Sequence, residues 1–475
     1  MVFHYQLLAS QLAGKIHSQA LKADQRLSSL RDFARQHEVS LSTAQSCYEL
    51  LEAQGLIYVR PRSGYFVKGQ SLQNPLPRHL DFQSRPRDVS NLELQIEIQQ
   101  ASIQTNLVHL GAIQLSPQLV PVEALRRSIQ RALKHSQPED FLYSDRQGHK
   151  KLRQALSEHW AEDGLYIQPE DILITSGCMP ALSLIIQQLT EVGDSILVPT
   201  PSFNGQLQLL ASLKRKIIEI PASHAGVDLD RLEQMMQSGQ VKACLMTANY
   251  QNPLGYCLTN TEKAQIAQLA ERYRCYVIED DIYAECGFNL ERPLPIKYWD
   301  QAGYVIYCGS VSKSLSSAYR IGWVCISQQL QSFRIGLLNG NAIVNTPLQL
   351  ALADLIYSRS YREHLNSLRP RLMQQVRQYQ EYILKAFQGV KIGLSQPEGG
   401  YALWLEFPVQ IDGLEMYHFA QRHGINIVPG EVFGEDRRYR HFIRLNAGHG
   451  LSHEICQSID KLAEWVKQKL DNTDS

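Results

Sequence analysis

Residues 275–283 are Cys-Tyr-Val-Ile-Glu-Asp-Asp-Ile-Tyr. The stretch begins with a strand-like run, 275–279, that is apolar up to Ile278 and typical of a buried β-strand. Glu279 is followed by the adjacent carboxylates of Asp280 and Asp281. A carboxylate at a dry strand end is costly unless it is paired with a cation. The stretch therefore predicts a core strand that places an acidic group at a polar site.

Apolar strand-like runs alternate with helical segments on both sides of this stretch. The other runs expected as strands are 172–175, 195–199, 216–220, 243–247, 304–307 and 323–326. The helices expected between them include 181–189 and 261–273, and Thr259 with Glu262 forms a capping box for the second. Short strands spaced by helices predict an α/β fold with a mostly parallel, helix-covered sheet. Ligands of such sheets bind beyond the strand ends.

Further motifs stand at these strand ends. They are Ser176-Gly177-Cys178-Met179-Pro180, Asn252-Pro253-Leu254-Gly255, Ser310-Val311-Ser312-Lys313 and Arg320-Ile321-Gly322. The first opens a helix, whose exposed N–H groups favour an anion. Taken singly, the motifs with glycine and proline are equally explained as structural turns.

The ordered set of motifs resembles the fold type I pyridoxal-phosphate enzymes, the aspartate aminotransferase superfamily, over about residues 106–475. The resemblance implies large and small subdomains and pyridoxal 5′-phosphate as cofactor. It implies that Lys313 condenses with the cofactor aldehyde and that Asp280 keeps the pyridine nitrogen protonated. Tyr283 would hydrogen-bond the phenolic oxygen together with Asn252. The candidate catalytic residues are therefore Lys313, Asp280 and Tyr283.

The same resemblance implies the other contacts of the site. Phe203 would stack on the cofactor ring, and Arg444 would bind a substrate α-carboxylate, with an ion-paired structural arginine as the alternative. Tyr143 would reach the phosphate of a neighbouring subunit, which implies a homodimer. The groups expected on the phosphate are the N–H groups of Gly177, Cys178 and Met179 and the side chains of Ser310, Arg320 and Ser312. No role is assigned to Asp281.

The first 69 residues have a different pattern. Leu8, Leu12 and Ile16 predict one helix, a second is expected from Ser29 and a third after Ser40, and a β-hairpin follows Gly55. This order predicts a winged helix-turn-helix. Residues 1–69 hold eight Lys or Arg and five Asp or Glu, a net charge of +3, which leaves 39 basic against 42 acidic residues in the remainder. The sign suits DNA, but charge alone favours the alternative, which is that these side chains are solvated helix faces.

Several motifs in this segment resemble the GntR-family DNA-binding domain. They include residues 27–31, 39–43 and the hairpin sequence Arg60-Pro61-Arg62-Ser63-Gly64-Tyr65-Phe66-Val67. The resemblance implies double-stranded operator DNA as a partner. The implied DNA contacts are Arg31, Ser42, Thr43 and Arg62.

Composition limits the remaining classes. The chain has 475 residues with 47 basic and 47 acidic side chains, and it contains neither an apolar run long enough to span a membrane nor an apolar signal core. We therefore expect a cytoplasmic protein without membrane contact. The nine cysteines never lie within three residues of one another, which excludes Cys-x-x-Cys zinc or redox motifs, and no metal site is expected.

The expected domains are a winged helix-turn-helix at 1–69, a proline-containing linker at 70–105 and the aminotransferase-like domain at 106–475. This combination resembles the MocR-type transcriptional regulators. It implies a regulator that senses an amino compound or pyridoxal phosphate, with weak or no turnover. The alternative is an active aminotransferase of amino acids with an accessory DNA-binding domain. A scaffold without cofactor is opposed by Lys313, Asp280 and Arg320.

Overall fold

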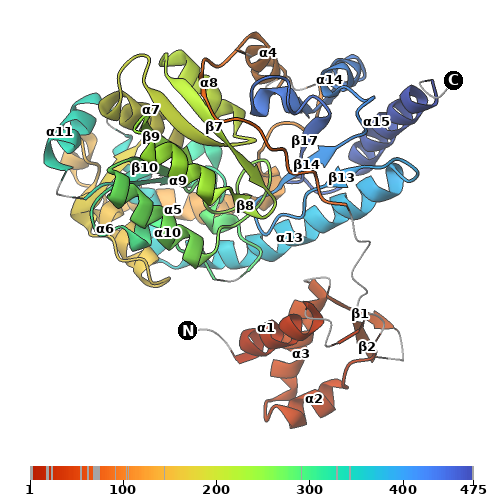
Figure 1. The fold of residues 1–475 in the computed structure, drawn as a ribbon. Helices are drawn as coiled ribbons and strands as arrows, with labels where there is room; N and C mark the ends of the chain where they lie inside the picture. Colours follow the sequence, from red (N-terminus) through yellow and green to blue (C-terminus); the bar gives the residue numbers. More distant parts are fainter. Residues whose placement is uncertain are drawn as a thin grey trace.

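The computed structural model describes most of the chain. The described residues are 4–17, 21–22, 25–53, 56–60, 64–67, 75–90, 92–102, 104, 106–143, 145–289, 291–327, 330–341 and 344–472. The expected DNA contact Arg62 lies outside these ranges. Figure 1 shows the helices and hairpin of the N-terminal unit, residues 4–67, in red, and the sheets and helices of the larger region in the other colours.

The N-terminal unit has the expected order of elements. These are α1 (His4–His17), α2 (Leu30–Gln36), α3 (Leu41–Ala53), β1 (Ile57–Arg60) and β2 (Gly64–Val67). Ser29 caps α2, because its hydroxyl accepts a hydrogen bond from the Asp32 N–H at 3.2 Å. The helices bury Leu8, Phe33 and Tyr48 between them, and the rings of Phe33 and Tyr48 lie 4.9 Å apart. β1 and β2 form an antiparallel hairpin.

A nine-stranded sheet forms the centre of the larger region. Its order is β3-β7-β6-β9-β10-β11-β12-β5, and β8 pairs with β7. The pairs from β7 through β6, β9 and β10 to β11 are parallel, whereas β12 is antiparallel to both of its neighbours. The strands are β3 (Pro86–Arg87), β5 (Ile172–Thr175), β6 (Ser195–Thr200), β7 (Lys216–Ser223), β8 (Gly226–Val227), β9 (Val241–Met246), β10 (Tyr276–Asp280), β11 (Val305–Ser310) and β12 (Gly322–Cys325).

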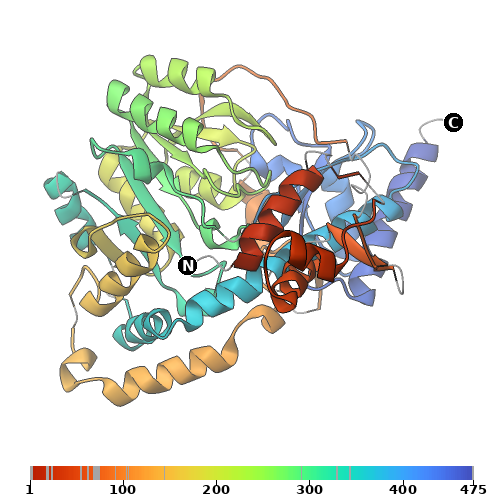
Figure 2. The same cartoon turned by 90° about the horizontal axis from the view of Figure 1, so that it is seen from below.

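Helices cover both faces of this sheet. Neighbouring residues of a strand, such as Leu173 and Ile174, belong to different hydrophobic clusters, because successive side chains of a strand point to opposite faces. Figure 2 shows α5 at the lower rim of the view. The covering and flanking helices are α5 (Val122–His135), α6 (Lys150–Ala161), α7 (Cys178–Leu189), α8 (Asn204–Ser212), α9 (Leu229–Gln237), α10 (Asn260–Tyr273), α11 (Gln331–Gly340) and α12 (Thr346–Tyr357).

A smaller antiparallel sheet follows towards the C-terminus. Its order is β13-β14-β17-β16, formed by β13 (Gly393–Leu394), β14 (Ala402–Glu406), β17 (Phe442–Asn446) and β16 (Val428–Pro429). The helices of this part are α13 (Ser360–Ala386), α14 (Gly413–Arg422) and α15 (His453–Asp471). β4 (Val108–His109) pairs separately with β15 (Ile425–Asn426), so the segment after the linker joins this part of the fold.

Residues 75–90, which we call the strap, lie along the larger region. The Leu394 N–H donates to the Pro75 carbonyl at 2.9 Å, and the Arg78 N–H donates to Glu406 Oε2 at 2.6 Å. Pro86 and Arg87 then form β3 on the edge of β7. Figure 1 shows the strap as an orange trace that crosses from β7 towards β13 and β14. Helix α4 (Leu92–Ser102) follows the strap.

All seven expected strands are present, with ends shifted by up to three residues. The expected capping box of α10 is also confirmed, since Thr259 Oγ1 accepts from the Glu262 N–H and the Glu262 carboxylate accepts from the Thr259 N–H. Among the described residues, the helices are all too short or too polar to cross a membrane.

Candidate functional site

The expected site motifs meet at one edge of the large sheet. Thr175 ends β5 and Ser310 ends β11, and both residues pair with Gly322 at the start of β12. Asp280 ends β10, which runs parallel to β11. The pairing therefore brings together three motifs, the first of which lies more than 100 residues before the other two in the sequence.

The turn after β5 forms a small backbone cradle. Gly177 has φ +113° and precedes the first turn of α7, and a Cβ there would lie 2.9 Å from Arg320 Nη2. Arg320 Nη2 also donates to the Ser176 carbonyl at 3.0 Å. In the neighbouring turn, the Ser312 N–H donates to Ser310 Oγ at 3.3 Å. The cradle joins free helix N–H groups, a hydroxyl and a guanidinium, which is the donor set of a phosphate site.

Asp280 is 4% exposed and accepts three hydrogen bonds. Cys178 Sγ and the Ile282 N–H donate to Oδ1 at 3.2 and 3.3 Å, and Gln206 Nε2 donates to Oδ2 at 2.8 Å. Burial raises the pKa of this carboxyl group, while these donors act in the opposite direction. The three hydrogen-bond donors of Asp280 are neutral, and the nearby charge of Lys313 also lowers its pKa.

Asp281 has a different set of partners. Asn249 Nδ2 donates to its Oδ1 at 2.8 Å, and Arg292 Nη2 pairs with its Oδ2 at 3.2 Å. Burial raises the pKa of Asp281 to about 6, and the charge of Arg292 opposes this shift. Asp281 is therefore part of a buried ion pair beneath the strand end.

Lys313 and Arg444 both lie near Tyr283. Lys313 Nζ lies 6.0 Å from the centre of the Tyr283 ring and donates to the Ile113 carbonyl at 2.6 Å. Burial, and then the charge of Arg444, lower the pKa of Lys313 to about 8. Asn252 also contributes a hydrogen bond that lowers the pKa of Tyr283, although burial raises it overall.

Arg444 is 4% exposed and has an open donor. Its Nη2 donates to the Gly111 carbonyl at 2.5 Å and its Nη1 donates to Asn252 Oδ1 at 3.4 Å, but Nε has no hydrogen-bond partner among the described residues. Burial lowers the pKa of Arg444 to about 10, so the guanidinium stays charged at pH 7. The described residues include no ion-pair partner for Arg444, and an acidic ligand would satisfy both the charge and the open donor.

Other expected residues occupy separate positions. Phe203 directly precedes α8 at the same edge of the sheet, after β6. Tyr143 is 97% exposed in the single chain and makes no contribution to the site of its own chain. In the N-terminal unit, Arg31 and Ser42 are exposed, and Thr43 lies in the first turn of α3, where Ser40 Oγ is 2.8 Å from its hydroxyl.

Comparison with known proteins agrees with this geometry. Residues 106–459 match the family model described as aminotransferase class I and II. The chain belongs to this family. It is also 34% identical over 98% of its length to the uncharacterized HTH-type transcriptional regulator YdcR of Escherichia coli (strain K12), 99% of which is covered. The HTH-type transcriptional regulator NorG of Staphylococcus aureus (strain USA300) is 27% identical over 93% of this chain and 100% of NorG. These relatives confirm the expected combination of a regulator with an aminotransferase-like domain.

Solved structures of the family are similar to this one. The multiple substrate aminotransferase of Thermococcus profundus has a TM-score of 0.71 and 25% identity, and the match covers 80% of this chain and 95% of that one. The kynurenine aminotransferase of Pyrococcus horikoshii, solved in complex with PMP, has the same TM-score, identity and coverage. The fold is aminotransferase fold type I, and the cofactor is pyridoxal phosphate. Two features of the site fit this group, namely the cradle that a Cβ at Gly177 would fill and the buried Asp280.

Several residues of this class I and II aminotransferase site were not predicted from the sequence. Gln206 lies three residues after Phe203, on a helix whose neighbouring positions Leu207 and Leu210 are apolar. A polar residue on such a buried face was the available signal. Cys178 was expected to contribute its backbone alone, but its thiol also donates to Asp280. Arg292, the partner of Asp281, lies in a loop without any motif.

Proposed function

We propose that this chain is a DNA-binding transcriptional regulator whose aminotransferase-like domain senses an amino compound. The supporting observation is that one chain joins the site around Lys313 and Arg444 to an N-terminal unit with exposed polar residues on α3. YdcR and NorG, which are named transcriptional regulators, are similar over nearly the whole chain. The proposed domains are a winged helix-turn-helix at 1–69, a linker at 70–105 and the cofactor domain at 106–475.

Pyridoxal phosphate supplies an aldehyde that bonds to amines and a ring that accepts electrons. In the proposal, Lys313 provides the amine that bonds to this aldehyde, and its lowered pKa leaves more of it neutral and nucleophilic. Asp280 pairs with the ring nitrogen, and Arg444 binds the carboxylate of the amino compound through its open donor. Tyr283 and Asn252 bind the phenolic oxygen, and Phe203 stacks on the ring. The proposed phosphate ligands are Gly177, Cys178, Met179, Ser310, Ser312 and Arg320, with Tyr143 from a partner subunit.

The proposal assigns DNA binding to the N-terminal unit. The proposed contacts are Arg31, Ser42, Thr43 and Arg62. Hydroxyl groups in the first turn of α3 suit base edges or phosphates, and the arginines suit phosphates. A homodimer would then place two such units on separated half-sites.

An active aminotransferase is the second candidate. It is supported by the intact site and by similarity to aromatic-amino-acid aminotransferase 1 of Thermococcus litoralis, at 29% identity over 75% of this chain. The two candidates differ in the fate of the amino acid. A sensor binds it and changes DNA affinity, whereas an enzyme releases a keto acid continuously.

The test is a spectral titration of the cofactor-loaded protein with a panel of amines and L-amino acids, followed by DNA binding in the presence of each one that changes the spectrum. The regulator proposal expects at least one compound to change both the spectrum and the DNA affinity. Spectral changes with sustained keto-acid production and constant DNA affinity would replace it with the aminotransferase.

A further inference from the structure

Three donors from three separate elements converge on the carboxylate of Asp280. Cys178 is the first residue of α7, Gln206 lies in α8, and Ile282 follows β10. Oδ1 accepts from the Cys178 thiol and the Ile282 N–H, whereas Oδ2 accepts from Gln206 alone. A carboxylate oxygen accepts about two hydrogen bonds. Oδ1 is therefore saturated and Oδ2 has room for one further donor.

We propose that Cys178 and Gln206 are positioning residues that orient Asp280 and keep it ionised, with Oδ2 as the oxygen that receives the cofactor's ring nitrogen. A buried carboxylate remains charged only when donors replace its hydration. Two of the three donors are side chains, so their substitution changes the support of Asp280 without changing Asp280 itself. This goes beyond the proposed function, because it concerns the cofactor site whether the chain is a regulator or an enzyme.

The thiol is suited to act as a donor here. Burial first, and then the neighbouring Asp280, raise the pKa of Cys178 well above that of a free thiol. Cys178 therefore stays protonated and donates. Cys244, on β9, is also buried, and among the described residues it makes no hydrogen bond to an acidic side chain, so it is a matched control.

The experiment compares Cys178→Ala, Cys178→Ser, Gln206→Leu and Cys244→Ala in the full chain. Two quantities are measured: the affinity for pyridoxal 5′-phosphate and the pH midpoint of its visible absorption in the loaded protein. Loss of one donor to a charged group should weaken cofactor affinity about tenfold and move the midpoint by about one pH unit in Cys178→Ala and Gln206→Leu. Cys178→Ser should restore both values, because a hydroxyl replaces the thiol as donor. If Cys178→Ala and Gln206→Leu match Cys244→Ala in both measurements, the proposal is wrong.

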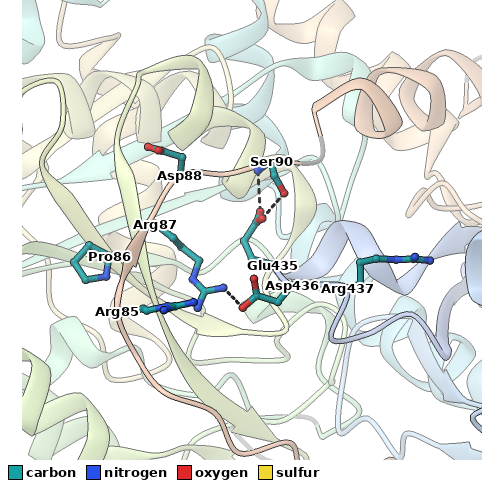
Figure 3. A pocket seen from close by; sticks show the side chains of 8 residues that line it. All are labelled: Arg85, Pro86, Arg87, Asp88, Ser90, Glu435, Asp436 and Arg437. Atoms are coloured by element: carbon teal, nitrogen blue, oxygen red, sulfur yellow. Dashed lines mark hydrogen bonds and ion pairs between the residues drawn. The ribbon is translucent and has the colours of Figure 1, made fainter.

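A second, independent observation concerns the strap. Figure 3 shows Arg87 beside Asp436 and Ser90 beside Glu435, with hydrogen bonds in both places. The Ser90 N–H donates to Glu435 Oε1 at 3.1 Å, and Arg87 Nε lies 3.7 Å from Glu219 Oε2 on β7. Glu435 is 4% exposed. Around Arg87 and Ser90, the strap therefore contacts both the large sheet and the segment that precedes β17.

That segment also reaches the candidate ligand site. The ring of Phe433 lies 5.2 Å from the guanidinium carbon of Arg444. The backbone carbonyl of Phe433 accepts a hydrogen bond from the Ser202 N–H at 2.8 Å. Glu435 follows two residues later, and its N–H donates to Glu219 Oε1 at 3.1 Å. One short segment thus contacts both the arginine of the site and the strap that leads to the N-terminal unit.

We infer that the joint between Ser90 and Glu435 couples ligand binding at Arg444 to the N-terminal unit. This rests on the proposed function. A displacement of Phe433 by a ligand changes the backbone that holds Glu435, and the strap then responds through Ser90. Because the joint lies outside the cofactor contacts, its loss should leave both amino-acid binding and DNA binding intact but remove the effect of the amino acid on DNA affinity.

The experiment uses Glu435→Gln, Ser90→Ala and the control Glu123→Gln, which alters an exposed ion pair with Arg126. The DNA is a set of fragments that the wild-type protein selects from a random library. The amino acid is the one of the twenty standard L-amino acids that changes the DNA affinity of the wild type most. The DNA affinity of each protein is measured with and without this amino acid. Both joint variants should bind DNA and the amino acid with wild-type affinity. The fold-change in DNA affinity that the amino acid causes should fall by at least two thirds. A fold-change equal to that of Glu123→Gln would refute the joint. If the wild-type protein itself shows no fold-change with any amino acid, the proposed function fails.

Discussion

Replacement of Arg444 by lysine is the sharpest test of how the site recognises an amino acid. The guanidinium is buried, charged at pH 7 and has one donor without a partner among the described residues. Arginine offers a carboxylate two parallel hydrogen bonds, whereas lysine offers a point charge. Arg444→Lys therefore retains the positive charge and removes one charge-assisted hydrogen bond.

The expected loss of amino-acid affinity follows from the loss of that one hydrogen bond. A hydrogen bond to a charged group contributes about 1.5–3 kcal/mol, which corresponds to an affinity loss of about 10- to 150-fold. The loss should appear for amino acids and not for amines that lack the carboxylate, because only the former reach Arg444. Lys313, which bonds to the cofactor in the proposal, is unchanged in the variant.

The assay is a spectral titration of cofactor-loaded wild type and Arg444→Lys with L-amino acids and with the matching decarboxylated amines. Each amine serves as the control for its own amino acid. Equal losses for both members of a pair would mean that the substitution disturbed the site generally, through Gly111 or Asn252. Unchanged affinity for both would show that another group binds the carboxylate. Either result would refute the assignment of Arg444.

Four further predictions concern single residues. Borohydride treatment of the loaded protein should label the peptide that contains Lys313, and labelling of another lysine would contradict this. The rate of cofactor attachment should rise with pH and level off above about pH 8, because burial lowers the pKa of this amine. Asp280→Ala should keep phosphate binding yet slow the reaction with amino acids about 100-fold in stopped-flow spectra, and an unchanged rate would assign the role to another group. Tyr143→Phe should weaken cofactor affinity about tenfold while sedimentation still shows a dimer, and a stable wild-type monomer with tight cofactor would exclude a shared site. Thr43→Ala should weaken DNA binding about three- to tenfold and leave the cofactor spectrum unchanged; unaltered DNA affinity would remove Thr43 from the interface.

The large sheet was predictable because its central strands are buried on both faces. Runs such as 172–175 and 195–199 consist mostly of apolar residues, and they are the strands β5 and β6 of the structure. The two-residue strands, such as β3 and β16, were not predicted, since so short a strand has no periodicity. Their positions depend on pairing with distant residues, as Pro86 pairs with Ile218.

The candidate site divides in the same way. Motifs at strand ends were predicted because their glycine, proline and charged residues interrupt an apolar pattern. Asp280, for example, is a charged residue at the end of a mostly apolar strand. The residues that support them were missed, because Gln206 and Arg292 become neighbours of Asp280 and Asp281 only through the fold. Ser90 and Glu435, which form the joint, are 345 positions apart along the chain, and neither residue belongs to a motif.

The energy available at Arg444 also bears on the choice between sensor and enzyme. A ligand shifts a conformational equilibrium only by the difference between its affinities for the two states. One charge-assisted hydrogen bond made in a single state provides about 1.5–3 kcal/mol, which matches the coupling of about 1–3 kcal/mol typical of allosteric proteins. Coupling is reciprocal, so the proposed regulator predicts that operator DNA changes amino-acid affinity by the same factor. The proposed coupling requires no turnover, because the proposed contact of Arg444 with a carboxylate supplies energy of this size whether or not the amino acid is released unchanged.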